Sequence, residues 1–262
     1  FEVMHCTHTK ICQTTRFMPN ILRLTLLMAT SFTTNSLPTT KVGPTTTRII
    51  CYGDSLTAGT TSSFMDVHPY APHLERTLNH DFTNESSNEK TAVVVRWMGL
   101  PGWTSSQMLS ALDTSQGLRG VLKNVKQQTG GESATLAIIL AGTNDLAYES
   151  SSLAIFESLT SLHRVSHDEG VPTVAIGIPP SAWQMIDEGA AALAKDVNER
   201  LKEWCDGGDG DGMASFLDFP FGYGGKEDEN WGPDGLHCTA RGYQILGEEL
   251  ASGVKSVLEA FA

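Results

Sequence analysis

A serine that directly follows a strand-like run is the first residue of this chain that could do chemistry. The β-branched run Arg48-Ile49-Ile50 leads into Gly53-Asp54-Ser55, a small tripeptide that turns sharply. Such a turn presents a serine hydroxyl at the end of a strand. Because serine is a poor nucleophile at its free pKa, the chemistry also needs a base and a site that stabilises an oxyanion.

A candidate base lies near the C-terminus, in Asp234-Gly235-Leu236-His237. If this segment makes one turn, the carboxylate of Asp234 comes close to the imidazole of His237 and accepts a hydrogen bond from one ring nitrogen. The other ring nitrogen can then take a proton from a serine. Taken alone, the motif could equally consist of a helix cap, Asp234, and a surface histidine.

Candidates for the oxyanion site lie between these two segments. Gly102 and the tetrapeptide Gly142-Thr143-Asn144-Asp145 each follow an apolar run. The side-chain amide of Asn144 is a hydrogen-bond donor, and a glycine suits a position that needs close approach or an unusual φ. Gly102 and Asn144 could each also be ordinary turn residues. We expect Asp145 to tie its loop together rather than to react.

Four sequence blocks in this order resemble the GDSL or SGNH hydrolases, over about residues 48 to 260. The blocks are Gly53-Asp54-Ser55-Leu56, Gly99-Leu100-Pro101-Gly102-Trp103-Thr104, Gly142-Thr143-Asn144-Asp145 and Asp234-Gly235-Leu236-His237. The resemblance implies a serine esterase that needs no metal. It also implies that Ser55, Asp234 and His237 are catalytic, and that the N–H groups of Ser55 and Gly102 and the amide of Asn144 form an oxyanion hole.

Other motifs fit these residues less well. Residues 53–59 are rich in glycine after a strand-like run, but they lack the Gly-Lys-Ser/Thr ending of a phosphate-binding loop. Ser55 does not stand in Gly-x-Ser-x-Gly, the nucleophile elbow of the α/β-hydrolases. The five cysteines include no Cys-x-x-Cys pair and do not indicate a disulfide framework. We therefore expect no metal site and no cofactor.

Composition and charge limit the class of protein. A length of 262 residues with 40% hydrophobic residues fits one α/β domain with a sizeable core. The net charge of −12 argues against nucleic acid or an anionic membrane surface as a partner, because both require a basic face. The expected partner is a small-molecule ester.

Residues 1–47 differ in composition from the rest of the chain. This segment is rich in Ser and Thr, is basic, and has Glu2 as its single acidic residue. Such a composition is typical of a secretory or organelle-targeting leader, with Met18–Ala29 as a short apolar core, although a disordered extension and a cytoplasmic location stay open. The apolar run is too short to span a membrane, for which about 20 residues are needed. We expect the hydrolase-like domain to occupy residues 48–262.

Apolar runs and helical periodicity alternate along residues 48–262. Strands are expected at 48–52, 92–97, 134–140, 173–178 and 213–217. Helices are expected from 69 through 78, within 109–126, at 152–167, at 183–204 with Ile186 in its apolar stripe, and from 239 onward. This alternation predicts a three-layer α/β/α flavodoxin-like sandwich around a mainly parallel five-stranded sheet.

In such sheets, ligands bind beyond the carboxyl ends of the strands, where the strand order reverses. Ser55 follows the first expected strand and Gly102 the second, while Asn144 follows the third. Asp234-Gly235-Leu236-His237 follows the fifth strand. The fold would therefore gather residues that are far apart in sequence on one rim of the sheet.

Aromatic residues in the same loops are candidates for substrate binding. They are Trp103, Trp183 and Tyr223, which could instead pack in the core or in a lid. The leading hypothesis is a carboxylic ester hydrolase that works through an acyl-enzyme and favours short-chain acyl or aryl esters. A thioesterase, lysophospholipase or acyltransferase would use the same residues. The alternative from a different class is a non-catalytic lipid- or glycan-binding module.

Overall fold

The computed structural model describes residues 46–84, 92–207, 210 and 212–261. The expected leader lies outside these residues except for Thr46 and Thr47. These two threonines are the first residues of strand β1 (Thr46–Gly53), so this strand begins two residues earlier than expected.

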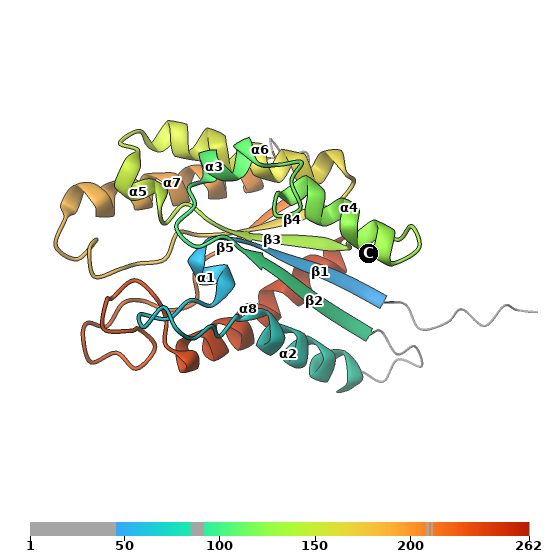
Figure 1. The fold of residues 1–262 in the computed structure, drawn as a ribbon, viewed down its shortest axis with the longest axis horizontal. Helices are drawn as coiled ribbons and strands as arrows, with labels where there is room; N and C mark the ends of the chain where they lie inside the picture. The colour runs from blue at the N-terminus through green and yellow to red at the C-terminus, as the bar shows by residue number, and fades with distance from the viewer. Residues whose placement is uncertain (1–45, 85–91, 208–209, 211, 262) are drawn as a thin grey trace, which may run out of the picture. The chain divides into compact units, whose positions relative to one another are not determined.

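The expected sandwich is confirmed (Figure 1). All strand pairs are parallel, in the order β2-β1-β3-β4-β5. The remaining strands are β2 (Ala92–Gly99), β3 (Leu136–Leu140), β4 (Thr173–Ile176) and β5 (Ala214–Leu217). Every residue of β3 and β4 is buried, as is typical of strands covered on both faces, whereas β2 alternates between buried and exposed positions at the edge of the sheet.

Helices cover both faces of this sheet. Their bounds are α1 (Ser55–Ala58), α2 (Ala71–Asn84), α3 (Ser105–Ser110), α4 (Leu118–Gln128), α5 (Asp145–Tyr148), α6 (Ser152–Asp168), α7 (Glu188–Asp206) and α8 (Ala240–Ala260). Figure 1 places α2 and α8 on one face and α3, α4, α6 and α7 on the other. None of the helices in the described part of the chain combines the length and the hydropathy that a bilayer span requires.

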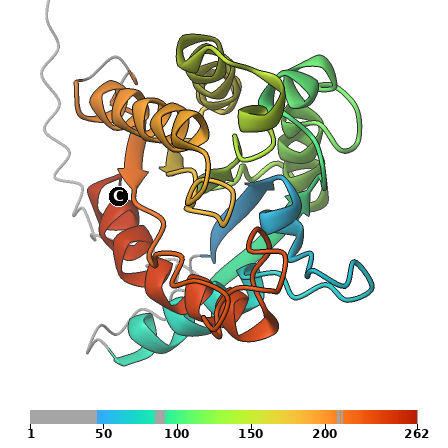
Figure 2. The same ribbon diagram turned by 90° about the vertical axis from the view of Figure 1, so that its left-hand side faces the viewer.

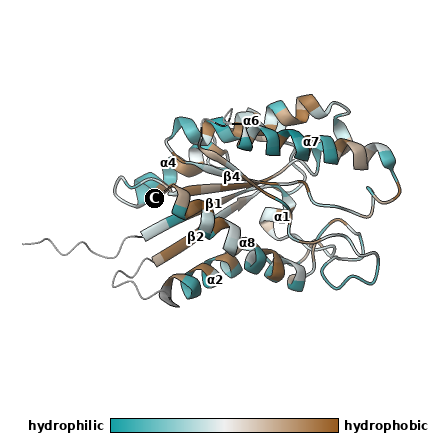
Figure 3. Cartoon of the chain, turned by 180° about the vertical axis from the view of Figure 1, so that it is seen from behind, coloured by the Kyte–Doolittle hydropathy of each residue, from teal (hydrophilic) through white to brown (hydrophobic). Residues whose placement is uncertain are grey.

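Each layer of helices packs on one face of the sheet and forms a separate hydrophobic core with it. One core includes Leu74 of α2 and Leu246 of α8, and the other includes Leu122 of α4, Leu159 of α6 and Val197 of α7. Figure 3 shows the corresponding pattern, with apolar strands between helices whose outer faces are hydrophilic. Burial of these apolar faces is the main force that holds the loops at the ends of the strands in place.

The expected helix over residues 183–204 is wrong at its N-terminal end. Helix α7 begins at Glu188, because the side chain of Asp187 accepts a hydrogen bond from the N–H of Ala190 and caps the helix there. Ile186 therefore lies in the turn before α7 and is 86% exposed, instead of belonging to the buried stripe.

The region expected to hold one or two helices over residues 109–126 contains α3 and α4. Helix α3 begins earlier than expected, because Thr104 and Gln107 form a reciprocal capping box. It ends at Ser110, and α4 does not begin until Leu118. The short helices α1 and α5 were not expected, since four residues are too few to show a helical period.

The loops that follow the strands lie at one end of the sheet, which faces the viewer in Figure 2. Strand β1 lies between β2 and β3, so the order reverses beside it. Ser55 follows this strand. A Cβ atom on Gly53 would lie 1.9 Å from the carbonyl oxygen of Leu140, so β1 can approach β3 this closely only with glycine at that position.

Candidate functional site

Ser55 is held at the first position of a single helical turn. Strand β1 ends at Gly53, and the side chain of Asp54 accepts a hydrogen bond from the N–H of Leu56 at 2.9 Å, which caps α1. Gly59 ends the turn with a φ of 77°, a conformation that favours glycine. The hydroxyl of Ser55 therefore stands beside the N-terminus of α1, at the carboxyl end of the sheet.

The structure brings Ser55, His237 and Asp234 into one hydrogen-bonded chain. The Nε2 atom of His237 lies 3.0 Å from the Oγ atom of Ser55, 182 positions away in sequence. The Nδ1 atom of the same ring lies 2.8 Å from Oδ2 of Asp234. Because a carboxylate only accepts hydrogen bonds, Nδ1 is the protonated nitrogen and Nε2 is left to accept the proton of the serine.

The turn around Asp234 fixes the orientation of the imidazole. Its Oδ1 atom accepts hydrogen bonds from the N–H groups of Leu236 and His237, both at 3.0 Å. Burial raises the pKa of the Asp234 carboxyl, but hydrogen bonds from His237 and Leu236 outweigh burial and hold the pKa below its usual value. The alternative in which Asp234 caps the last helix is wrong, because Thr239 caps α8 instead. His237 is also buried rather than at the surface.

Tyr223 packs beneath this turn. Its ring lies 5.9 Å from the ring of Trp231, edge to face. A Cβ atom on Gly235 would lie 2.9 Å from the Tyr223 hydroxyl, so Tyr223 and the turn are in close contact. This position supports the loop that carries Asp234 and His237, and contact between Tyr223 and a substrate stays a prediction.

The three expected oxyanion-hole donors belong to the serine turn, the loop after β2 and the loop after β3. They are the N–H groups of Ser55 and Gly102 and the side-chain amide of Asn144. Gly102 has a φ of 80°, and a Cβ atom there would meet no atom within 4 Å, so the backbone conformation rather than space favours glycine. Asn144 donates from Nδ2 to the carbonyl of Trp103 at 3.0 Å, which uses one of its two amide hydrogens. Among the hydrogen bonds within the described residues, none engages the N–H of Ser55 or Gly102.

Asp145 joins the two loops that carry these donors. Its carboxylate accepts hydrogen bonds from the N–H of Ser105 at 3.0 and 3.1 Å and from the Ser105 hydroxyl at 2.5 Å. Burial raises the pKa of Asp145, although the hydrogen bonds from Ser105 oppose that rise. Asp145 therefore ties its loop, as expected, to a specific partner, which is Ser105 at the start of α3.

The sequence suggested that Asp54 ties the serine turn together, and its hydrogen bond with Leu56 does so. Asp54 is fully buried, and this burial raises the pKa of its carboxyl to about 7. Two contacts around the serine were not expected from the sequence. The Tyr243 hydroxyl, from α8, donates to the carbonyl of Thr60 at 2.5 Å. The ring of Phe64 lies 5.4 Å from the ring of His237, at an interplanar angle of 78°. No periodicity or motif in the sequence marks these long-range contacts.

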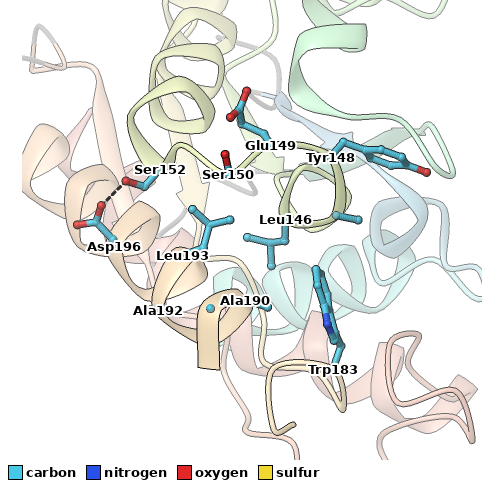
Figure 4. Close-up of a pocket in the computed structure, with 12 residues that line it drawn as sticks. Leu146, Tyr148, Glu149, Ser150, Ser152, Trp183, Ala190, Ala192, Leu193 and Asp196 are labelled. Atoms are coloured by element: carbon cyan, nitrogen blue, oxygen red, sulfur yellow. Dashed lines mark hydrogen bonds between the residues drawn. The ribbon is translucent and has the colours of Figure 1, made fainter. Parts of the chain in front are cut away.

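Trp183 and Trp103 occupy different surroundings. Trp183 lines a pocket of about 700 Å³ between α5 and α7, where Leu146 and Tyr148 also lie (Figure 4). None of Ser55, Asp234 and His237 lines this pocket. Trp103 is partly buried against the core under α4 and α6, and it contributes its carbonyl oxygen to Asn144. Contact between either tryptophan and a substrate stays a prediction.

The chain also carries His163 and His167 at the i,i+4 spacing of some zinc ligands. His163 Nδ1 lies 2.8 Å and His167 Nε2 2.9 Å from the hydroxyl of Thr173. Burial lowers the pKa of His163 to about 3, so this ring is neutral. Within the described ranges, no three His, Cys, Asp or Glu side chains are grouped as metal ligands would be.

Comparison with solved structures finds the same fold. A lipase/acylhydrolase from Enterococcus faecalis has a TM-score of 0.52 at 20% identity, over 80% of this chain and 96% of that one. A carbohydrate acetylesterase family member from Sinorhizobium meliloti has a TM-score of 0.53 at 20% identity, over 81% and 99%. A family 3 carbohydrate esterase from Clostridium thermocellum has a TM-score of 0.57 at 18% identity, over 83% and 99%.

Comparison at the level of sequence identifies the family. No significant match was found among curated protein sequences. The sequence profile of the GDSL-like lipase/acylhydrolase family matches residues 51–245, which include the serine turn, both donor loops and the Asp234–His237 turn. The chain therefore belongs to the GDSL-like lipase/acylhydrolase family and is a carboxylic ester hydrolase.

Proposed function

We propose that the enzyme cleaves esters through an acyl-enzyme formed on Ser55. The Oγ atom of Ser55 attacks the carbonyl carbon of the ester while Nε2 of His237 takes its proton. When the tetrahedral intermediate collapses, the ester C–O bond breaks and Nε2 returns the proton to the departing alcohol. A water molecule then releases the acid by the same two steps.

Asp234 acts on this reaction through His237. Its carboxylate holds Nδ1 in the protonated form and stabilises the positive charge that the ring carries between the two proton transfers. The low pKa of Asp234 fits this role, because the carboxylate remains ionised while the imidazole becomes charged.

The oxyanion hole in this proposal consists of the N–H groups of Ser55 and Gly102 and the second amide hydrogen of Asn144. Negative charge develops on the carbonyl oxygen during attack, so donors that are already oriented lower the barrier without reorganisation. The contact of Asn144 with the Trp103 carbonyl supports this proposal, because it fixes the amide before a substrate binds.

The observation that carries the proposal is the chain of contacts from Ser55 through His237 to Asp234, with distances of 3.0 and 2.8 Å. A fluorophosphonate probe tests it, because such probes label only activated serines. We expect one label on Ser55, located by peptide mass spectrometry, and no label in Ser55→Ala. Ser63→Ala, which removes an exposed serine of the next loop, is the matched control and should label normally.

Hydrolysis of p-nitrophenyl acetate by the same three proteins completes this test. Ser55→Ala should lose turnover while it keeps the circular dichroism spectrum and the unfolding temperature of the wild type. Turnover that persists in Ser55→Ala would rule out the acyl-enzyme on this residue, whatever the labelling shows.

The acyl group we propose is short, and the acceptor is water. The same residues would serve a thioesterase, a lysophospholipase or an acyltransferase. A panel of a thioester, a lysophospholipid and an oxygen ester, each with and without an added alcohol, separates these reactions by kcat/KM and by product. An acetylated sugar belongs in the panel, because two of the similar structures are described as carbohydrate esterases.

A further inference from the structure

We infer that Phe64 forms the subsite for the alcohol part of the ester, and that this subsite takes apolar or aryl alcohols. The inference rests on the proposed roles of Ser55 and His237. It assigns a substrate class to one side of their site, which the family match leaves open.

The position of Phe64 is unusual in two ways. Among the residues that the structure describes, it is the only non-glycine residue with a positive φ, at 55°. Its side chain is also 70% exposed although it is one of the largest apolar side chains. A bulky residue adopts this conformation at an energetic cost, and such residues concentrate at functional sites.

The loop that carries Phe64 is anchored at both ends. Thr60 and Val67 form an antiparallel bridge, and the N–H of Phe64 donates to the carbonyl of Thr61 at 2.9 Å. The Tyr243 hydroxyl of α8 holds the carbonyl of Thr60. The ring of Phe64 is therefore placed against His237 by hydrogen bonds at the base of its loop.

The proton transfers decide which part of an ester reaches this ring. After the attack, Nε2 of His237 gives its proton to the oxygen of the departing alcohol, so that oxygen must come within hydrogen-bond distance of Nε2. The carbonyl oxygen points the other way, toward Gly102 and Asn144. The carbon chain of the alcohol therefore leaves the reacting centre on the side of His237, where the exposed ring of Phe64 lies 5.4 Å from the imidazole.

The test compares two esters that differ only in the alcohol. Benzyl acetate and methyl acetate carry the same acyl group, and their alcohols have similar acidity, so the intrinsic reactivity of the two esters is close. We expect Phe64→Ala to lower kcat/KM for benzyl acetate about tenfold, as the loss of roughly 55 Å² of apolar contact implies. For methyl acetate, kcat/KM should change less than twofold.

Two further variants serve as controls. Met65→Ala shortens the next side chain of the same loop, which is 87% exposed, and should leave both esters within twofold of the wild type. Phe64→Leu keeps an apolar side chain and should retain part of the preference for benzyl acetate. Fluorophosphonate labelling of Ser55 in all variants shows that the site is folded.

Two outcomes would overturn the inference. If Phe64→Ala lowers kcat/KM equally for both acetates, the ring acts on His237 itself and not on the alcohol. If Phe64→Ala instead lowers kcat/KM more for ethyl butyrate than for ethyl acetate, which differ only in the acyl group, Phe64 contacts the acyl part of the ester. A wild type that labels at Ser55 and cleaves neither acetate contradicts the alcohol subsite and the short acyl group but not the acyl-enzyme. One that neither labels nor cleaves contradicts the acyl-enzyme as well.

Discussion

Asn144 uses one amide hydrogen to keep its place, and no other hydrogen bond of its side chain is found among the described residues. The first hydrogen goes to the carbonyl of Trp103 at 3.0 Å. A backbone carbonyl accepts this bond equally well with or without a substrate, so the amide is oriented in advance. In the proposed reaction, the hydrogen bond from the second amide hydrogen to the substrate becomes strong only when the carbonyl oxygen becomes negative.

Replacement of Asn144 by alanine should therefore act on the transition state. We expect Asn144→Ala to lower kcat by roughly 10²–10³ with little change in KM. Steady-state kinetics with p-nitrophenyl acetate measure both constants. A rise in KM at constant kcat would instead make Asn144 a residue that binds the ground state of the substrate.

The buried carboxyl of Asp54 makes the free energy of unfolding depend on pH. Burial raises the pKa of its carboxyl from 3.8 to about 7. Between these values the unfolded chain has released this proton while the folded chain still holds it, so the free energy of unfolding falls as pH rises. The stabilising contribution is complete below about pH 4 and is lost as the pH passes through about 7.

Asp54→Asn should remove this pH dependence, because the amide keeps an oxygen that can accept from the N–H of Leu56. We expect the free energy of unfolding of the wild type, relative to the variant, to fall by up to about 4 kcal/mol between pH 4 and 7. Urea denaturation at several pH values measures it, with the exposed Asp66→Asn as the control. Parallel curves for wild type and Asp54→Asn would mean that Asp54 is ionised throughout this range.

At the scale of elements, Asp145 joins the two loops that carry Gly102 and Asn144. The loop after β3 carries Asn144, and the loop after β2 carries Gly102. Three hydrogen bonds from Ser105 to the carboxylate of Asp145 connect the start of α3 to the start of α5. The spacing between the donors therefore depends on a residue that is not itself expected to touch the substrate.

Asp145→Asn should loosen this connection, since one of the two oxygens is replaced by a donor that faces the donors of Ser105. We expect kcat to fall about 10- to 100-fold and the protein to lose about 1–3 kcal/mol of stability. Ser105→Ala removes only the hydroxyl contact and should show a smaller loss of both. Normal kcat in Asp145→Asn would show that each loop holds its donor independently.

Prediction from sequence succeeded for elements with a strong apolar pattern and failed at their ends. The runs around Ile49 and Ile138 are continuously apolar, as expected of strands covered on both faces, and α8 carries an apolar stripe at helical spacing, so the type and order of these elements were confirmed. The predicted start of α7 was wrong, because Ile186 stands at a position that fits the helical period although it lies in a turn. The sequence pattern cannot distinguish such an exposed apolar residue from a buried one. The contact of Phe64 with His237 was missed, since it depends on the tertiary path of a loop.

At the scale of the whole molecule, the described residues build a core on each face of the sheet. Buried apolar side chains from Ile49 to Leu258 contribute to these cores. We propose that deletion of residues 1–44 preserves folding and esterase activity, because the first strand begins at Thr46. Thermal unfolding and kcat/KM of the shortened chain check this. A loss of soluble protein would mean that the deleted segment packs on the domain.

The proposed preference for short acyl groups concerns the pocket between α5 and α7, whose lining begins at Leu146, two residues after Asn144. This pocket has apolar walls in Leu146, Leu193 and Trp183, but Glu149 and Asp196 also line it. A long acyl chain that entered this pocket would remove water from these carboxylates, at a cost that offsets the gain from apolar contact. A short acyl group avoids that cost.

We therefore expect acetyl and butyryl esters to have higher kcat/KM than esters of about twelve carbons, which need a deep apolar pocket. Measurements with p-nitrophenyl acetate, butyrate, octanoate and laurate below their micelle limits give this profile. Asp196→Asn removes one charge from the pocket and should raise kcat/KM for octanoate while it leaves acetate unchanged. A wild-type profile that rises steadily to laurate would contradict the short-chain proposal and favour a lysophospholipase or thioesterase.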